Sequence, residues 1–263
     1  FTRNVPLLLQ IILWYSILIQ LPRVKQSLEF LDTFFISNRG IYSPRPIFEN
    51  GFSYVFIAFI LALISSFIIR RWAKKRQDDT GQQFPVISTA FGLIILLPLF
   101  LFFILGSPMS FDYPALKGFN FKGGMVIRPE FIAMFLALTI YTAAFISETV
   151  RSGILSVTKG QREASASLGL KKSWIMRLII IPQALRVIVP PLTSQYLNLT
   201  KNSSLGIAVG YADLVHGFGG ISLNQTGQAI ECMVIVMATY LTISLTISVF
   251  MNIYNRSIQF KEK

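Results

Sequence analysis

The sequence has very little of what metal centres and enzyme active sites are built from. Among its 263 residues there is one cysteine, Cys232, and one histidine, His216. One cysteine excludes an intrachain disulfide, and a metal site would need clustered carboxylates, which the sequence does not offer. We therefore interpret His216, in the glycine-rich stretch 206–220, as a loop or interface residue rather than a ligand.

Two motifs of catalysis are also absent. The sequence has no glycine- and lysine-containing phosphate loop, so we expect this chain not to hydrolyse ATP. It has no Gly-x-Ser-x-Gly elbow of the kind that carries a nucleophilic serine. We accordingly assign no catalytic, metal-binding or cofactor-binding residues, and the chain is not expected to be an enzyme by itself.

Charge is scarce as well. Charged residues make up 14% of the chain, hydrophobic residues 53%, and the mean hydropathy is +0.58. Soluble domains are about one quarter charged, so this composition argues against both a soluble enzyme and a disordered chain. The net charge of +12 does not indicate a nucleic-acid partner, because the cations gather beside apolar runs, as in a membrane protein.

Long apolar runs dominate what is present. A helix needs about 20 mostly apolar residues to cross about 30 Å of hydrocarbon. Six stretches meet or approach this length, which predicts an all-α integral membrane protein with about six transmembrane helices: Val5–Leu21, Phe52–Ile69, Phe84–Leu105, Glu130–Ser147, Trp174–Leu199 and Gly227–Ile253. Pro182, Pro190 and Pro191 predict an irregular or kinked fifth span.

The distribution of lysine and arginine predicts the orientation. The loops 1–4, 70–83, 148–177 and 254–263 hold 15 cations, whereas the opposite set, 22–51, 106–129 and 200–226, holds 8. Cationic loops stay in the cytoplasm, so both visible ends and loop 148–177 are predicted to be cytoplasmic. Topology alone explains the cluster Arg70–Arg76, and contact with anionic lipid is the alternative.

The cytoplasmic loop 148–177 has the pattern of a short helix. Thr158 and Gln161 have capping-box spacing, so a helix is expected to start near Lys159, and Gly169 is placed to end it in the left-handed conformation. The small side chains between them would let another surface approach closely. Local physics alone also allows an ordinary connector.

The same loop resembles a known signature. Glu163-Ala164-Ser165, then Gly169, then Ile179-Ile180-Ile181-Pro182 match the spacing of the cytoplasmic motif of permease subunits of ABC importers. Ser165 and Ile181 are mild departures from that motif. The resemblance implies the type I importer permease fold and an ATP-binding ABC partner subunit that holds ATP and Mg. It also implies a coupling helix that docks on this partner through Gly160, Glu163, Ala164, Ser165 and Gly169.

Further segments narrow the resemblance. GQREASASLGL at 160–170, the stretch 181–214 and RNVPLLLQ at 3–10 are similar to polar amino-acid permeases. LNQTGQAIE at 223–231 and the insertion within 22–129 resemble the general L-amino-acid and glutamate/glutamine/aspartate branch. The resemblance implies a first visible transmembrane helix in 1–22, a branch-specific insertion with two more in 23–129, and a core permease domain in 130–263. It also implies a membrane span before Phe1, so we expect the sequence to lack its natural N-terminus.

The implied function is import of polar L-amino acids across the bacterial cytoplasmic membrane, driven by ATP hydrolysis in the partner. The implied partners are a second permease subunit, by resemblance a paralogue, and an external amino-acid-binding protein, beside the membrane lipid. Two other classes are considered. An ion-gradient-driven secondary transporter would use Glu231 or Lys201 for ion coupling, and a membrane-embedded enzyme or scaffold has no motif behind it.

Polar residues in the apolar spans are candidates for a substrate path, because burying them in a membrane is costly. Ser194, Asn198 and Lys201 share one helical face, and Lys201 could meet a carboxylate. Gln225, Gln228 and Glu231 would share another face, with Glu231 suited to an ammonium group. The alternatives are helix–helix hydrogen bonding and a structural Lys201–Glu231 pair. Thr139 and Thr142 add hydroxyl groups on the fourth span.

Overall fold

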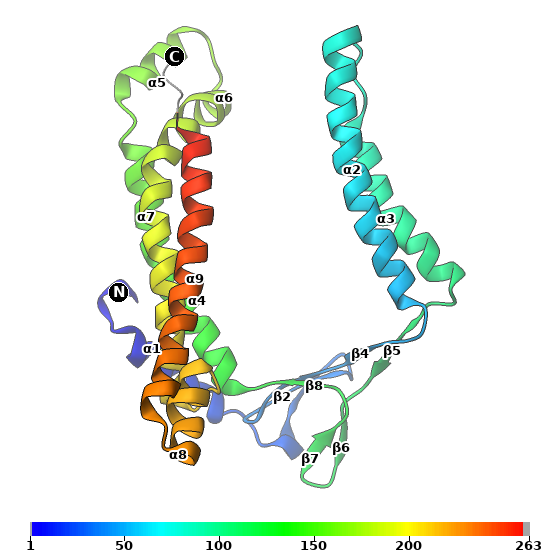
Figure 1. Ribbon diagram of the computed structural model, residues 1–263, viewed down its shortest axis with the longest axis vertical. Coiled ribbons are helices and arrows are strands. Elements are labelled where there is room, and N and C mark those ends of the chain that lie inside the picture. The colour runs from blue at the N-terminus through cyan, green and yellow to red at the C-terminus, as the bar shows by residue number, and fades with distance from the viewer. Residues whose placement is uncertain (1, 260–263) are drawn as a thin grey trace. The chain divides into compact units, whose positions relative to one another are not determined.

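The chain divides into two compact units. The structure, a computed structural model, describes residues 2–259 and is mainly helical (Figure 1). Among those residues, the first unit holds 2–27, 36–41 and 127–259, and the second holds 28–35 and 42–126. The second unit falls within the stretch 23–129 that the sequence predicts as an insertion.

The first unit is a helical bundle whose central helix packs on two others. α7 lies against both α4 and α9, and α1 lies against α4 (Figure 1). One apolar cluster joins α1 to α4, and another joins the beginning of α7 to the end of α4. The helices of this unit are η1 (Thr2–Asn4), α1 (Leu7–Ile19), η2 (Val24–Gln26), α4 (Pro129–Leu155), α5 (Lys159–Ser167), α6 (Lys172–Ile175), η3 (Met176–Ile180), α7 (Ile181–Asn202), η4 (Ser203–Val209), η5 (Val215–Ser222), α8 (Leu223–Thr226) and α9 (Ala229–Ile258).

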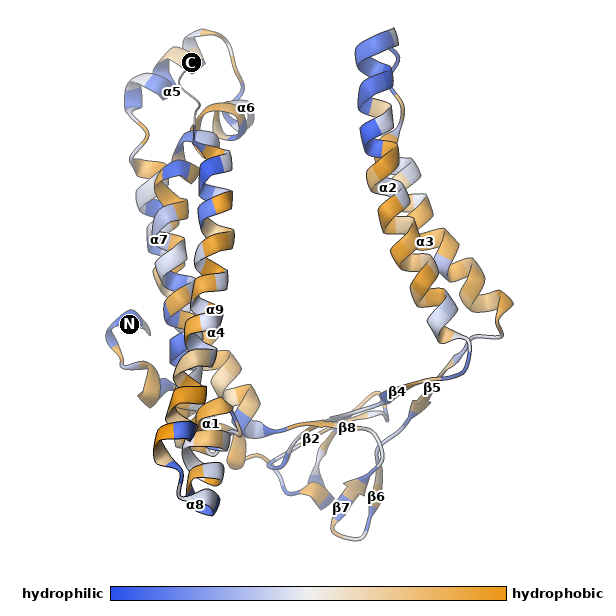
Figure 2. Cartoon of the chain, viewed as in Figure 1, coloured by the Kyte–Doolittle hydropathy of each residue, from blue (hydrophilic) through white to orange (hydrophobic). Residues whose placement is uncertain are grey.

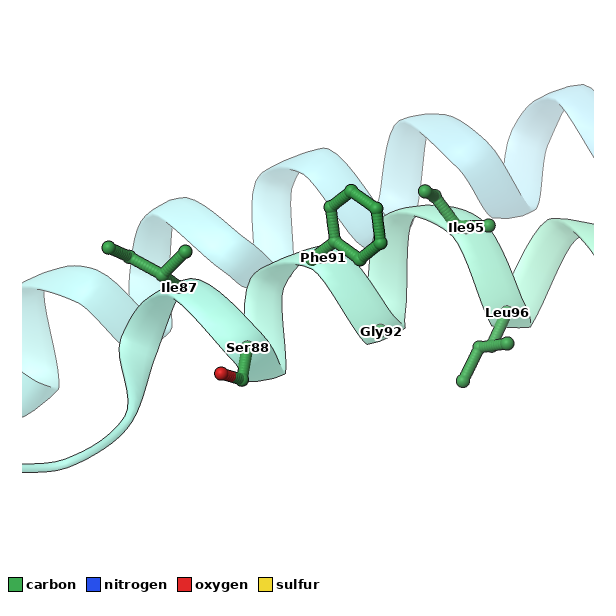
Figure 3. A pocket seen from close by; sticks show the side chains of 6 residues that line it. All are labelled: Ile87, Ser88, Phe91, Gly92, Ile95 and Leu96. Atoms are coloured by element: carbon green, nitrogen blue, oxygen red, sulfur yellow. The ribbon is translucent and has the colours of Figure 1, made fainter.

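The second unit is built around a pair of packed helices, α2 (Phe52–Thr80) and α3 (Val86–Ile104). Val55, Ala58, Ala62 and Ser66 are the buried residues of the apolar part of α2, and most of them are small, which lets the two helices approach closely. On α3, the absence of a side chain at Gly92 leaves a shallow apolar groove (Figure 3), lined by Ile87, Ser88, Phe91, Ile95 and Leu96.

Short strands occupy the segments that the sequence analysis treated as outer loops. They are β1 (Leu28–Phe30), β2 (Phe34–Ser37), β3 (Gly40–Ser43), β4 (Arg45–Phe48), β5 (Met109–Asp112), β6 (Ala115–Lys117), β7 (Asn120–Lys122) and β8 (Met125–Ile127). One sheet has the order β1-β2-β3-β8, and two antiparallel pairs are β4-β5 and β6-β7. In the β4-β5 pair Arg45 faces Asp112 and Phe48 faces Met109, so this ladder joins the residues just before α2 to those just after α3. The expectation of an all-α chain therefore holds for the spans but not for their outer connections.

Within residues 2–259, five helical segments are long and apolar enough to cross a membrane, one fewer than predicted. They are Phe52–Thr80, Val86–Ile104, Pro129–Leu155, Lys172–Val209 and Ala229–Ile258. The predicted span Val5–Leu21 is wrong as a complete crossing, because α1 has 13 residues and a length of about 20 Å. α1 starts after Pro6, and Gln20 and Pro22 follow its end, which is consistent with its shortness.

Helix α2 continues beyond its predicted span. The sequence analysis treated 70–83 as a loop, but α2 stays helical to Thr80 and ends at Gly81, whose φ is +71°. The connection to α3 is therefore short, and the cluster Arg70–Arg76 lies on a helix. Lys261 and Lys263, which were predicted to be cytoplasmic, lie outside the described residues.

The irregularity predicted near Pro182 takes the form of a π-helical turn. η3 ends two residues before Pro182, and α6, η3, α7 and η4 form one continuous helical run, Lys172–Val209. Proline has no N–H to donate and its ring crowds the carbonyl four residues earlier, here that of Leu178. The wider π turn gives that crowded backbone an alternative hydrogen-bond pattern.

Candidate coupling surface and translocation path

The short helix predicted in the cytoplasmic loop is confirmed as α5. Thr158 precedes it with extended backbone angles, φ −60° and ψ 148°. Gly169 follows it with φ +73°, and its N–H donates to the carbonyl of Ala166 at 2.9 Å. The side chain of Thr158 makes no capping hydrogen bond; its backbone carbonyl accepts from the N–H of Gln161 instead. The capping-box spacing thus predicted where the helix begins, although the side-chain hydrogen bond of a capping box is not formed.

Four of the five residues expected to form a docking surface are exposed. Gly160, Glu163, Ala164 and Gly169 all lie on the surface of this unit. A Cβ added to Gly160 or Gly169 would meet no atom within 4 Å. Glu163 forms no ion pair with any residue in the described range 2–259. The exposed face of α5 therefore has small side chains and carries a carboxylate that no ion pair within the described residues neutralises.

Ser165, the fifth of these residues, lies on the opposite side of the helix. It is 4% exposed, and its hydroxyl donates to the carbonyl of Gln161 within the same helix. A buried hydroxyl of this kind cannot reach a docked partner. The side chain of Ser165 therefore lies on the packed side of α5 and does not contribute to the exposed surface of this helix.

A hydrogen bond from Arg162 connects α5 to the end of α4. Its Nη2 donates to the carbonyl of Ile154 at 3.0 Å. Ile154 is in the last turn of α4, where carbonyl groups lack partners within the helix and where a cation is favoured by the helix dipole. The sequence analysis counted Arg162 only among the cations of loop 148–177, because this bond depends on how the chain turns between α4 and α5.

Below α5, α4 and α7 cross with almost no space between them. A Cβ on Gly153 would overlap Ile188 Cγ1 and would lie 3.3 Å from the carbonyl of Ala184. Val157, just before α5, and Leu170, just after it, belong to the same apolar cluster as Ala184 and Ile188. Helix α5 is thus packed directly on the α4–α7 crossing.

The polar face predicted on α7 is present. Ser194, Asn198 and Lys201 all lie within α7, and all three side chains are exposed. On α4, Thr139 is exposed whereas Thr142 is 8% exposed and lies in the helix packing. An exposed polar row in an apolar helix needs water or a polar partner, which is what a translocation path provides.

The second predicted face is wrong in part. Gln225 belongs to α8, which ends at Gly227 with φ +68°, and Gln228 is the residue before α9. The helical turn is broken at Gly227, so Gln225 does not share a helix face with Glu231. Gln228, by contrast, is the N-cap of α9, and its carbonyl accepts from the N–H of Cys232. Glu231 lies in the first turn of α9 and is exposed. Lys201 and Glu231 are both described residues, and no salt bridge joins them.

The described residues contain no group of three or more histidine, cysteine, aspartate or glutamate side chains placed to hold a metal ion. The backbone N–H of His216 donates to Oδ1 of Asp213 at 2.8 Å, in a loop-to-helix junction. Cys232 is a buried free thiol on α9. His216 is the second residue of η5, and the expectation of a loop position does not hold for it.

Comparison with known families gives a match over most of the chain. Residues 56–260 match the family described as the inner membrane component of binding-protein-dependent transport systems. That range includes α5, the polar face of α7 and Glu231. The match therefore takes in the whole candidate site.

Individual relatives are also similar. The general L-amino acid transport system permease protein AapQ of Rhizobium johnstonii is 50% identical over 99% of this chain and 65% of its own length. The putative amino-acid ABC transporter permease protein YhdX of Escherichia coli is 51% identical over 99% and 67%. The glutamate/glutamine/aspartate/asparagine transport system permease protein BztB of Rhodobacter capsulatus is 43% identical over 99% and 68%. The chain thus spans about two thirds of the length of these relatives.

Among solved structures, a crystal structure of an amino acid ABC transporter with histidines is 26% identical to this chain. It covers 79% of this chain and 90% of its own, with a TM-score of 0.45.

Proposed function

Because the chain belongs to the family of inner membrane components of binding-protein-dependent transport systems, we propose that it is the permease subunit of an ATP-driven importer of polar L-amino acids. The single observation that carries this proposal is α5, a short exposed helix that bears the signature Glu163-Ala164-Ser165 and Gly169. The names of AapQ, YhdX and BztB, all amino-acid permeases, support the substrate class.

In this proposal the partner subunit binds ATP with Mg and hydrolyses it, and this chain supplies no cofactor-binding residues. The partner contacts the exposed face of α5, where Gly160, Ala164 and Gly169 allow close approach and Glu163 offers a charge. Movement of α5 reaches α4 through Arg162 and reaches α7 through the close contact at Gly153. Packed helices with no free volume transmit displacement, because their contacts cannot be compressed.

The substrate would pass beside the polar residues of α7 and α9. An amino acid carries an ammonium and a carboxylate, and each must find compensation while it crosses hydrocarbon. Lys201 suits the carboxylate and Glu231 the ammonium, while Ser194, Asn198 and Gln228 offer neutral hydrogen bonds. Because Lys201 and Glu231 do not pair with each other here, both charges are available to a substrate.

The other partners follow from the same assignment. They are a second permease subunit, by similarity a paralogue, and an external amino-acid-binding protein that delivers the substrate. The chain is a multi-pass inner membrane protein, and we infer that its C-terminus is cytoplasmic. Arg186 Nε donates to the carbonyl of Ile258 at 3.1 Å, so the end of α9 lies beside the beginning of α7, near α5.

The decisive experiment is uptake by proteoliposomes. The full-length protein, its second permease and its ATPase are reconstituted, and the binding protein is added outside with labelled glutamate, glutamine or aspartate. We expect uptake that needs ATP inside the vesicles and the binding protein outside. Uptake driven by a proton or sodium gradient without ATP would contradict the proposal and favour a secondary transporter.

A further inference from the structure

The basic end of α2 is an ordered helical surface. The apolar part of α2, Phe52–Ile69, has a length of about 27 Å, close to the thickness of the hydrocarbon layer. The helix then continues to Thr80, and Figure 2 shows the change from hydrophobic to hydrophilic along it. Because the apolar part fills the hydrocarbon, the residues that follow directly must lie at the level of the lipid headgroups.

Four cations share one side of this extension. With 100° per residue, Arg70, Arg71, Lys74 and Lys75 lie within an arc of about 140°. All four side chains are exposed. Ala73, which is 4% exposed, lies outside this arc, on the buried side of α2. The cationic arc, defined here as Arg70, Arg71, Lys74 and Lys75, is therefore turned away from the helix packing.

No ion pair with another described residue neutralises the charges of the arc. In the described range 2–259, no salt bridge involves any of the four, although Asp78 and Asp79 follow on the same helix. The guanidinium of Arg71 lies 4.6 Å from the ring centre of Phe67, one turn earlier. That contact holds Arg71 alongside the last apolar turn and leaves its charge facing outward.

The neighbouring cation Arg76 makes contacts with both polar and aromatic side chains near the end of α2. Arg76 lies over the ring of Trp72 at 5.4 Å and donates to Oε1 of Gln82 at 2.9 Å. Trp72 also meets the edge of Phe84 at 5.5 Å. Tryptophan favours the boundary between hydrocarbon and headgroups, so this cluster marks the same depth as the arc.

We propose that the cationic arc of α2 is a binding surface for the headgroups of anionic phospholipids in the cytoplasmic leaflet. A headgroup phosphate beside Arg70 and Lys74 replaces the counter-charge that the chain does not supply. Cationic clusters next to a membrane span are attracted to anionic lipid in this way. A rigid helix keeps the four charges on one side, whereas a flexible loop would spread them.

The test is native mass spectrometry of the full-length protein with equal amounts of phosphatidylglycerol and phosphatidylcholine. We expect the wild-type protein to bind phosphatidylglycerol preferentially, and the preference to fall as salt is raised. In the variant R70Q/R71Q/K74Q/K75Q the preference should fall about tenfold, and in R70K/R71K/K74R/K75R it should be kept. The variant K74Q/K75Q, which retains two cations to direct insertion, should show an intermediate loss.

The matched control removes the same number of charges from the opposite set of loops, as R23Q/R45Q/K117Q/K122Q. We expect it to keep the wild-type preference. An equal loss in this control, or an unchanged preference in both glutamine variants of the arc, overturns the proposal. So does loss of ATPase co-purification with lipid preference intact, because the arc would then bind a protein partner.

Discussion

The guanidinium of Arg162 and the backbone carbonyl of Ile154 are joined by a 3.0 Å hydrogen bond that connects α5 to the last turn of α4. Part of this contact is buried, and Nε of the same arginine is buried without a partner. A hydrogen bond from a charged donor contributes about 1.5–3 kcal/mol. This bond therefore helps to hold α5 against the last turn of α4.

Replacing Arg162 by alanine should weaken coupling more than assembly. We expect Arg162→Ala to retain the ATPase during purification, because its side chain points to α4, while the number of amino acids transported per ATP falls severalfold. Arg162→Lys should recover most of this ratio, since an ammonium can still donate to Ile154. The measurement is uptake and hydrolysis in the same proteoliposomes. A normal ratio in the alanine variant would contradict the assigned role.

A large side chain at Gly169 should interfere with binding of the ATPase partner. A Cβ added here would meet no atom of the described residues within 4 Å, and the positive φ costs about 1 kcal/mol for most residues. Gly169→Trp should therefore insert normally but lose the ATPase on co-purification. Gly169→Asn, which tolerates this φ, is the control and should retain it. Retention by the tryptophan variant at the wild-type level would mean that α5 is only a connector.

Glu163 should matter less than the close approach around it. Glu163 is the fifth residue of α5 and lies beyond its first turn, so the helix dipole adds little to the role of its charge. Glu163→Gln keeps the shape and most of the hydrogen-bonding capacity, so co-purification of the ATPase should fall only slightly. A loss as complete as that of Gly169→Trp would show that a charge pair dominates the interface.

Adding even one methyl group where α4 crosses α7 should lower the stability of the protein. Gly153→Ala places its Cβ against Ile188 and should cost about 1–3 kcal/mol through overpacking. Ile188→Ala alone leaves a cavity and is also destabilising. The double variant should be more stable than the sum of the two losses predicts, as measured by thermal unfolding of the purified variants. Simple additivity would show that the two residues are not in contact.

Lys201 and Glu231 should behave as separate groups. Lys201→Gln and Glu231→Gln are each expected to reduce uptake while membrane insertion and ATPase binding stay normal, because both side chains are exposed and unpaired with each other. The exchange K201E/E231K should not restore uptake. Recovery in the exchanged variant would identify a structural ion pair and remove both residues from the path.

Orientation can be tested by labelling single cysteines with an impermeant reagent. On a Cys232→Ser background, a cysteine at Lys117 should react in intact cells, and one at Lys74 should not. Both positions are exposed within their units, so accessibility reports the side of the membrane. Reaction at 74 and protection at 117 would reverse the whole topology.

The sequence predicts best where one physical signal acts alone. The apolar lengths of α2, α3, α4 and α9 specify helices, and Gly169 ends α5 because a left-handed residue was needed there. The sequence predicts the structure less well where two backbone conformations have similar free energies. The extension of α2 to Thr80 is such a case, since a charged run is compatible with either loop or helix.

The candidate site shows the same division. The exposure of Glu163 and Ala164 and the single face of Ser194, Asn198 and Lys201 follow from helical periodicity. Ser165 turns inward because α5 packs on one side only, and Gly227 interrupts the face that ends at Glu231. The bond from Arg162 to Ile154 depends on how the chain turns between two helices, which no spacing in the sequence specifies.

None of the residues of α3 is fully buried, and this has a consequence for how the helix can vary. Where no neighbouring side chain encloses a residue, its shape is unconstrained, and only its preference for hydrocarbon over water is under selection. Leucine, isoleucine, phenylalanine and valine are then interchangeable on the face of α3 that is turned away from α2. At Gly153, by contrast, one added methyl group alters the distance between two helices. The two regions should therefore drift at very different rates during evolution.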